Sequence, residues 1–201
     1  MYKIIAIIGK SGSGKSHLLK WLTSFFDLRP QEKERYNIIL PATTRPQRPN
    51  EVNGKDYEFI TVETLNALAG DGQIAEISKF RDWYYATFWK NLDTKKINIG
   101  ILTPHAIEIL ENNPNVVIQK IYISCPDEQR LIRQLQRIPP DVDEVVRRYS
   151  TDKKDFSNIT TDYIINNENG NFMAATERLW QIIINLSQPQ NVDAFWTKSI
   201  K

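Results

Sequence analysis

Apolar positions along the chain follow two alternating patterns. Short runs of β-branched and apolar residues, typical of buried strands, occupy residues 2–8, 36–40, 97–102, 116–124 and 163–165. Between them, apolar positions three or four residues apart predict helices at residues 16–26, 105–112, 127–137 and 172–186. Strands that alternate with helices indicate an α/β fold, in which helices cover both faces of a parallel sheet.

One long segment, residues 41–93, interrupts this alternation. It is rich in Pro, Asn, Thr and aromatic residues, and it predicts short strands at 58–62, 73–78 and 83–88 with a helix near 63–69. We interpret it as an inserted lobe with a small mixed or antiparallel sheet. The predicted parts are a core (1–40 and 94–187), the inserted lobe (41–93), a short lid within the core around Pro139 and Pro140 (137–150) and a tail (188–201).

The polar tail carries a few apolar residues, among them Phe195 and Trp196. Two interpretations stay open at this point. The tail is a loose end with one docked aromatic turn, or it binds a partner.

Composition narrows the class of protein. The 201 residues are 41% hydrophobic and 25% charged, as in a soluble globular protein. No apolar run approaches the roughly 20 residues of a membrane span, and the N-terminal run is too short for a signal peptide. The single cysteine, Cys125, excludes an intrachain disulfide. We therefore expect a cytoplasmic protein with no membrane partner.

The net charge argues against nucleic acid as a ligand. With 26 basic and 24 acidic residues the net charge is +2, which argues against a broad nucleic-acid surface. Any phosphate binding must therefore be local, and nucleic acid is not an expected partner.

The strongest motif follows the first predicted strand. Its eight residues match G-x-x-x-x-G-K-[ST]: Gly9, Lys10, Ser11, Gly12, Ser13, Gly14, Lys15 and Ser16. Glycines let backbone N–H groups approach phosphate oxygens, and the helix N-terminus that follows attracts anions. Lys15 is suited to the β- and γ-phosphates and the Ser16 hydroxyl to Mg²⁺, so the motif predicts ATP and Mg²⁺. The alternative is a glycine-rich turn in which Ser11 or Ser13 caps the helix.

A second anion site is predicted inside the inserted lobe. Arg45 and Arg48 lie three residues apart on a proline-stiffened loop and can converge on one phosphate. Tyr57 and Tyr85 can add hydroxyl donors. The alternative is a solvated basic loop.

At this point the sequence resembles a known family. Residues 43–59 are similar to the guanylate kinase signature T-T-R-x-x-R-x-x-E-x-x-G-x-D-Y-x-F. The resemblance continues at Glu76 and residues 84–87, and more weakly at Arg133, Arg137, Arg148 and residues 164–166. With the phosphate loop it covers residues 3 to 187, closely in the first half and loosely in the second.

The resemblance implies a phosphate-loop nucleoside monophosphate kinase that converts GMP or dGMP and ATP to GDP or dGDP and ADP. Four residues would hold the acceptor phosphate, with Glu51 orienting the arginines: Arg45, Arg48, Tyr57 and Tyr85. Glu76 and Thr87 would bind the guanine edge. A single carboxylate can accept both adjacent guanine donors, N1–H and N2–H₂, and adenine has no such pair.

The same resemblance implies that Arg133, Arg137 and Arg148 are cations of the transition state, with Arg147 competing for the place of Arg148. The alternative is that they form surface ion pairs with Asp127, Asp141 or Asp143. Asn166 would contact the adenine of ATP, or it would simply end a strand in a turn.

Three positions depart from the family pattern. Gly100 and Leu102 stand where the family has two aspartates, which puts the metal shell and acceptor affinity in question, and Thr103 or His105 could compensate. Pro41 replaces a guanine-contacting serine. Three hypotheses therefore stay open: a GMP or dGMP kinase, a kinase for another acceptor such as a modified nucleotide or a phosphosugar, and an inactive protein-binding module. Nucleotides are the expected partners of the enzyme, as a monomer or a homodimer.

Overall fold

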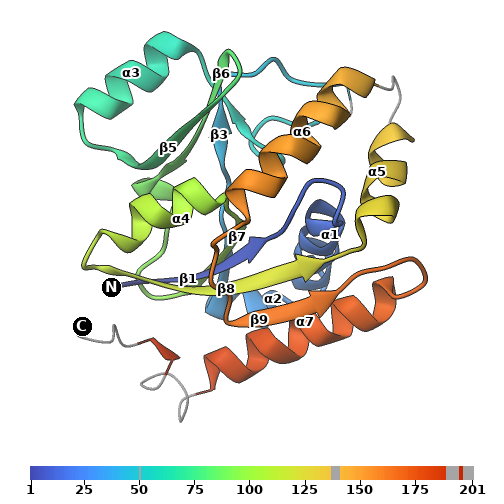
Figure 1. Cartoon of the computed structure of the whole chain (residues 1–201). Coiled ribbons are helices and arrows are strands. Elements are labelled where there is room, and N and C mark those ends of the chain that lie inside the picture. The colour runs from blue at the N-terminus through green and yellow to red at the C-terminus, as the bar shows by residue number, and fades with distance from the viewer. Residues whose placement is uncertain (50, 137–140, 189–194, 197–201) are drawn as a thin grey trace.

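The computed structural model describes residues 1–49, 51–136, 141–188 and 195–196, and it contains two sheets (Figure 1). The larger sheet has five strands in the order β2-β7-β1-β8-β9. All of its neighbouring strands run parallel. Its strands are β1 (Tyr2–Ile8), β2 (Tyr36–Ile38), β7 (Ile97–Ile101), β8 (Val116–Ser124) and β9 (Tyr163–Asn166). The predicted α/β class with a parallel sheet is confirmed.

Both faces of this sheet are buried, and the central strand β1 shows why its sequence is a continuous apolar run. Ile5 and Ile7 join a core cluster with α1 (Lys15–Asp27) and α7 (Phe172–Ser187). Ile4 and Ile8 join another cluster with α4 (Pro104–Glu111). Side chains alternate between the two faces of a strand, so β1 has apolar residues at every position from Ile4 to Ile8.

The second sheet lies within the inserted segment and has the order β4-β3-β6-β5. Its strands are β3 (Ala42–Thr43), β4 (Glu58–Phe59), β5 (Ile74–Phe80) and β6 (Trp83–Phe88). The β3–β4 pair is parallel and the other two pairs are antiparallel, so the sheet is mixed, as expected. Helix α3 (Val62–Gly70) packs on it through Leu65. The predicted strand 58–62 is shorter because the Thr61 hydroxyl accepts a hydrogen bond from the Thr64 N–H and begins α3.

Two helices were not predicted: α2 (Pro30–Arg35) and α6 (Val142–Asp155). Helix α2 buries none of its residues and carries no apolar period. Helix α6 buries only Val145 and Asp152, and its apolar spacing is limited to Val142, Val145, Val146 and Tyr149. The predicted lid, residues 137–150, is therefore helical from Val142 onward, and its residues 137–140 lie outside the described residues. Helix α5 (Asp127–Leu135) precedes it, and a short 3₁₀ turn (Trp89–Asn91) follows β6.

The described part of the tail is docked on the core. Trp196 is buried, and its indole Nε1 donates to the Leu186 carbonyl oxygen at 2.9 Å. Among the residues that the structure describes, no helix combines the length and apolar character of a membrane span.

Candidate functional site

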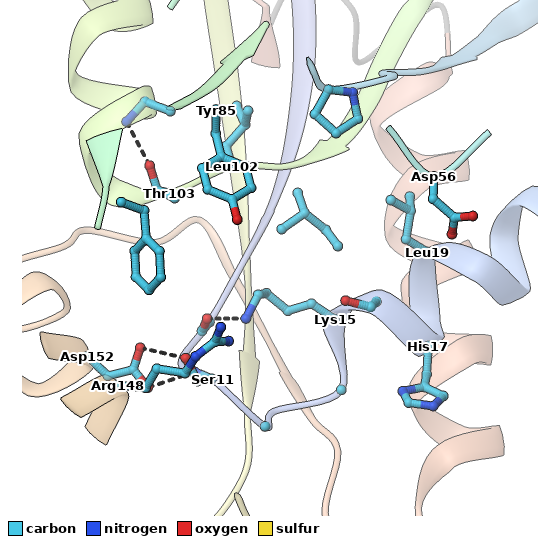
Figure 2. Close-up of a pocket in the computed structure, with 18 of the residues that line it drawn as sticks. Ser11, Lys15, His17, Leu19, Asp56, Tyr85, Leu102, Thr103, Arg148 and Asp152 are labelled. Atoms are coloured by element: carbon cyan, nitrogen blue, oxygen red, sulfur yellow. Dashed lines mark hydrogen bonds between the residues drawn. The ribbon is translucent and has the colours of Figure 1, made fainter. Parts of the chain in front are cut away.

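The phosphate loop joins β1 to α1 at the carboxyl edge of the larger sheet. Gly9, Gly12 and Gly14 have φ values of 149°, 80° and 96°, which side chains rarely adopt. Space is also restricted: a Cβ on Gly12 would lie 2.4 Å from the Arg130 carbonyl oxygen. The Lys15 ammonium donates to the carbonyl oxygens of Gly9 and Lys10 (Figure 2). The loop therefore has the backbone shape that the motif predicts.

An ion pair between Arg130 and Asp152 contacts the phosphate loop at Ser11, and this pair was not predicted from the sequence. The Asp152 carboxylate on α6 accepts from the Ser11 N–H at 2.7 Å and from the Ser11 hydroxyl at 3.2 Å (Figure 2). Arg130 on α5, only 1% exposed, donates to the Ser11 carbonyl oxygen at 2.7 Å and to Asp152 at 3.1 Å. Both sides of the Ser11 residue are thus fixed by helices more than 110 positions away.

Arg133 and an asparagine after β9 also contact the loop. The Asn167 amide donates to the Ser13 carbonyl oxygen at 2.8 Å, and Arg133 donates to the Asn167 carbonyl oxygen at 3.0 Å. The predicted residue Asn166 is instead exposed and hydrogen-bonded to Glu168, and it is not among the residues that line the cavity. Strand alternation explains the difference, since Ile165 and Asn167 share the buried face.

In the second predicted anion site, Glu51 contacts both Arg45 and Arg48. Glu51 accepts two hydrogen bonds from the Arg45 guanidinium, at 3.0 and 2.8 Å, and one from the Arg48 backbone N–H at 2.9 Å. Burial alone would raise the pKa of Glu51, but the hydrogen bonds from Arg45 outweigh it and the pKa is lowered. Arg45 also lies 5.4 Å from the Tyr57 ring, whose centre is 6.1 Å from that of Tyr85. Glu51 therefore fixes Arg45, while Arg48 stays exposed.

Glu76 on β5 and Thr87 on β6 are cross-strand neighbours. The Thr87 hydroxyl donates to Glu76 Oε1 at 2.8 Å. The other carboxyl oxygen, Oε2, is buried and has no hydrogen-bond partner among the described residues. Burial raises the pKa of Glu76 to about 7, although the Thr87 hydrogen bond works in the opposite direction. This carboxyl group is thus poised for a ligand that brings hydrogen-bond donors.

One cavity of about 1590 Å³ connects these sites. It is larger than the roughly 300–1,000 Å³ of a typical small-molecule pocket, which suits two ligands. Its lining includes the phosphate loop, both arginines of the second site, Glu76 and Thr87. Ser16 lines it as well, at the start of α1.

Two of the departures from the family pattern, Pro41 and Leu102, line this cavity, and Gly100 is not among its lining residues. A Cβ on Gly100 would lie 2.9 Å from the Ile39 Cβ, so Ile39 fills the space that a side chain at position 100 needs. Ile39, Pro41 and Leu102 line the cavity together, and we call them the apolar wall. The suggested substitutes Thr103 and His105 also line the cavity. The Thr103 hydroxyl caps α4 through the Ala106 N–H at 3.1 Å, and His105 is exposed beside Glu108. Within the described ranges, no group of three or more His, Cys, Asp or Glu residues could hold a metal ion.

The lid arginines share one carboxylate. Glu144 accepts from Arg147 Nε at 2.8 Å and from Arg148 Nε at 2.5 Å. The expected surface partners Asp127, Asp141 and Asp143 are therefore wrong for these two arginines. Burial raises the pKa of Glu144, but the hydrogen bonds from both arginines dominate and lower it to about 2. Arg147 and Arg148 both line the cavity, whereas Arg137 lies outside the described residues.

A parallel sheet with a phosphate loop at its carboxyl edge and a second cationic cluster lining the same cavity defines a phosphate-loop α/β protein with two candidate anion sites. The guanylate kinase family matches residues 1–185 of the chain. The chain is 31% identical over 151 residues to a guanylate kinase of Thermosynechococcus vestitus, covering 73% of this chain and 74% of that one. It is 29% identical over 185 residues to one of Streptococcus agalactiae, covering 90% and 85%.

A solved structure agrees on the fold. The guanylate kinase of Anaplasma phagocytophilum superposes with a TM-score of 0.56 at 19% identity, covering 93% of this chain and 87% of that one. The chain belongs to the guanylate kinase family.

Proposed function

We propose that this protein transfers the γ-phosphoryl group of ATP to GMP or dGMP. The observation that carries the proposal is the buried Glu76 carboxyl group, whose Oε2 has no partner among the described residues. Guanine brings two adjacent donors, N1–H and N2–H₂, which suit the two carboxyl oxygens. An acceptor base without these donors would leave a buried polar atom unpaired, which is a strong basis for discrimination.

The remaining residues fit the two phosphate-bearing ends of the reaction. We assign the acceptor phosphate to Arg45, Arg48, Tyr57 and Tyr85 on the lobe of residues 41–93. The donor phosphates would lie against the loop amides and Lys15. Arg133 and Arg148, with Arg147 as the alternative to Arg148 and Arg137 as a further candidate, would neutralise charge that develops on the transferred group. Such a reaction depends on alignment and charge rather than on covalent catalysis.

The guanylate kinase family implies Mg²⁺, and the residues present fit it in a limited way. The Ser16 hydroxyl is exposed at the cavity and is a suitable ligand. Gly100 and Leu102 offer no carboxylate, so Ser16 and the phosphates of ATP would hold Mg²⁺, with water completing the shell. When bound, the ion would neutralise phosphate charge.

The test is ADP release with ATP and Mg²⁺ against a panel of ribo- and deoxynucleoside monophosphates, with Lys15→Ala and Glu76→Gln as variants. Turnover with GMP or dGMP, lost in Lys15→Ala and reduced at least a hundred-fold in Glu76→Gln, would support the proposal. Turnover with no guanine nucleotide would overturn it.

The apolar wall favours one second candidate, a kinase for a different acceptor. Pro41 and Leu102 line the cavity where the family pattern has polar residues, so GMP would make fewer polar contacts here than in other family members. A modified nucleotide or a phosphosugar that does not need those contacts would be affected less. With modified nucleotides and phosphosugars added to the panel, faster turnover of one of them than of GMP would favour this candidate. The inactive binding module is disfavoured by the intact loop residues Gly14, Lys15 and Ser16.

A further inference from the structure

The tip of the β5–β6 hairpin touches helix α6. Arg81, in the turn between β5 and β6, forms an ion pair with Glu144 on α6. The neighbouring Phe80 ring lies 4.2 Å from the Arg147 guanidinium and 5.6 Å from that of Arg148. We call these five residues the hairpin–helix contact. It joins the segment that carries Glu76 to the helix that carries two candidate transition-state cations (Figure 1).

The backbone at Arg81 indicates that its side chain matters. Among the described residues, Arg81 is the one non-glycine residue with a positive φ, at 55°. This left-handed conformation suits Gly, Asn or Asp better than Arg. Turn geometry therefore does not favour arginine here, whereas the ion pair with Glu144 does.

Glu144 is the centre of the contact. Its carboxylate is bound by Arg81, Arg147 and Arg148, of which the last two line the cavity. Its side chain is only 14% exposed, so its position is set by these three partners. Because one partner belongs to the hairpin and two to the cavity, a shift of the hairpin changes the forces on the two cavity arginines.

The same helix also reaches the phosphate loop. Asp152 lies eight residues after Glu144, about 12 Å along the helix axis, and accepts the Ser11 N–H at 2.7 Å. Helix α6 thus contacts the hairpin near one end and the donor loop near the other.

We propose that Glu144 is a positioning residue: through Arg81 it couples the position of the acceptor hairpin to the placement of Arg147 and Arg148 over the cavity. This inference rests on the proposed phosphoryl transfer. Binding of the acceptor nucleotide then aligns the cavity arginines, and the two nucleotides bind with positive coupling. Such coupling is reciprocal, so each nucleotide strengthens the binding of the other by the same factor.

The first test is amide hydrogen exchange of the protein without nucleotide, and it does not depend on activity. Arg81→Asn removes the ion pair and keeps a residue that suits a positive φ. Asp82→Asn, at the next position of the same exposed turn, is the matched control. We expect faster exchange in the first turns of α6 for Arg81→Asn only. Equal exchange of α6 in both variants would overturn the proposal.

The second test measures the coupling itself. Affinity for GMP is determined with and without a non-hydrolysable ATP analogue, in wild type, Arg81→Asn, Asp82→Asn and Arg81→Lys. We expect Arg81→Asn to lower the coupling factor about two- to five-fold, the range expected for a partly exposed ion pair, and Arg81→Lys to restore most of it. Glu144→Gln should lower kcat as well, because it also loosens both cavity arginines. An Arg81→Asn protein with wild-type coupling would refute the inference.

The two proposals fail in distinguishable ways. A wild-type protein that binds GMP without phosphorylating it would overturn the proposed function. The hydrogen-exchange and GMP-affinity measurements would still test the hairpin–helix contact. A wild-type kinase with unchanged coupling in Arg81→Asn would overturn the role of Glu144 alone.

Discussion

Replacing Glu76 by Gln separates what this buried carboxyl group costs in stability from what it contributes to binding. Its pKa is about 7 in the folded protein against an ordinary value of 4.5. Because the pKa is raised, the unfolded chain ionises first, and the free energy of unfolding falls as pH rises from 4.5 through 7. A difference of 7 minus 4.5 corresponds to about 3 kcal/mol at pH 8 and above.

Glutamine does not ionise, so the Glu76→Gln protein lacks this pH-dependent loss. Its amide oxygen can still accept the Thr87 hydrogen bond, but its buried N–H groups meet no partner, at a cost of about 1–3 kcal/mol. We therefore expect the variant to be less stable than wild type near pH 5 and equal or more stable at pH 8. The difference between the two proteins should shift by about 2–3 kcal/mol across this range.

Urea unfolding at several pH values, without nucleotide, measures the two curves. Asp71→Asn, which removes an exposed carboxyl group from the same lobe, should run parallel to wild type. A difference between Glu76→Gln and wild type that does not change with pH would refute the assignment of a buried, protonated carboxyl group. The same variant should lose GMP binding, because its amide opposes guanine donors with donors of its own.

Two further predictions test the packing around the cavity, and a third tests the docking of the tail. Gly12→Ala should abolish ATP binding in a nucleotide-binding titration, since its Cβ would approach the Arg130 carbonyl oxygen to 2.4 Å; wild-type affinity would contradict the loop geometry. Gly100→Asp should lower the free energy of unfolding by about 1–3 kcal/mol because of Ile39, and Ile39→Ala in the same chain should recover part of it; a neutral single change would contradict this. Trp196→Ala should cost about 3–5 kcal/mol in urea unfolding, whereas a loose tail would lose nothing.

Local patterns predicted the elements that bury an apolar face. Strand β1 and helix α1 carry strong periods, and the glycines of the loop between them follow from the backbone that phosphate binding requires. Helix α2 carries no such signal because almost all of its residues face solvent, and in α6 the apolar spacing is confined to residues 142–149. The exposed charges of α6 indicate a polar segment and do not specify its conformation, which the Asp141 cap and the packing of Val145 help to set.

Contacts between distant segments were beyond the reach of a single sequence. Nothing local marks Asp152 as the partner of Ser11, or Ile39 as the residue that fills the space beside Gly100. The structure places Asn167 on the buried face with Ile165, but Tyr163, Ile164 and Ile165 are all apolar, so the sequence did not show which face of β9 is buried.

A comparison of three carboxylates that line the cavity supports the specificity role proposed for Glu76. Glu51 is fixed by Arg45, and Asp152 by Ser11 and Arg130, so each is already neutralised by protein donors. Glu76 instead receives one hydrogen bond from a neutral hydroxyl, and its second oxygen has no partner within the described residues. Burial without a cation keeps this group costly, and a base that supplies donors relieves the cost. With Pro41 and Leu102 offering no polar side chain, the proposed discrimination between acceptor bases would depend mainly on Glu76 of β5 and Thr87 of β6.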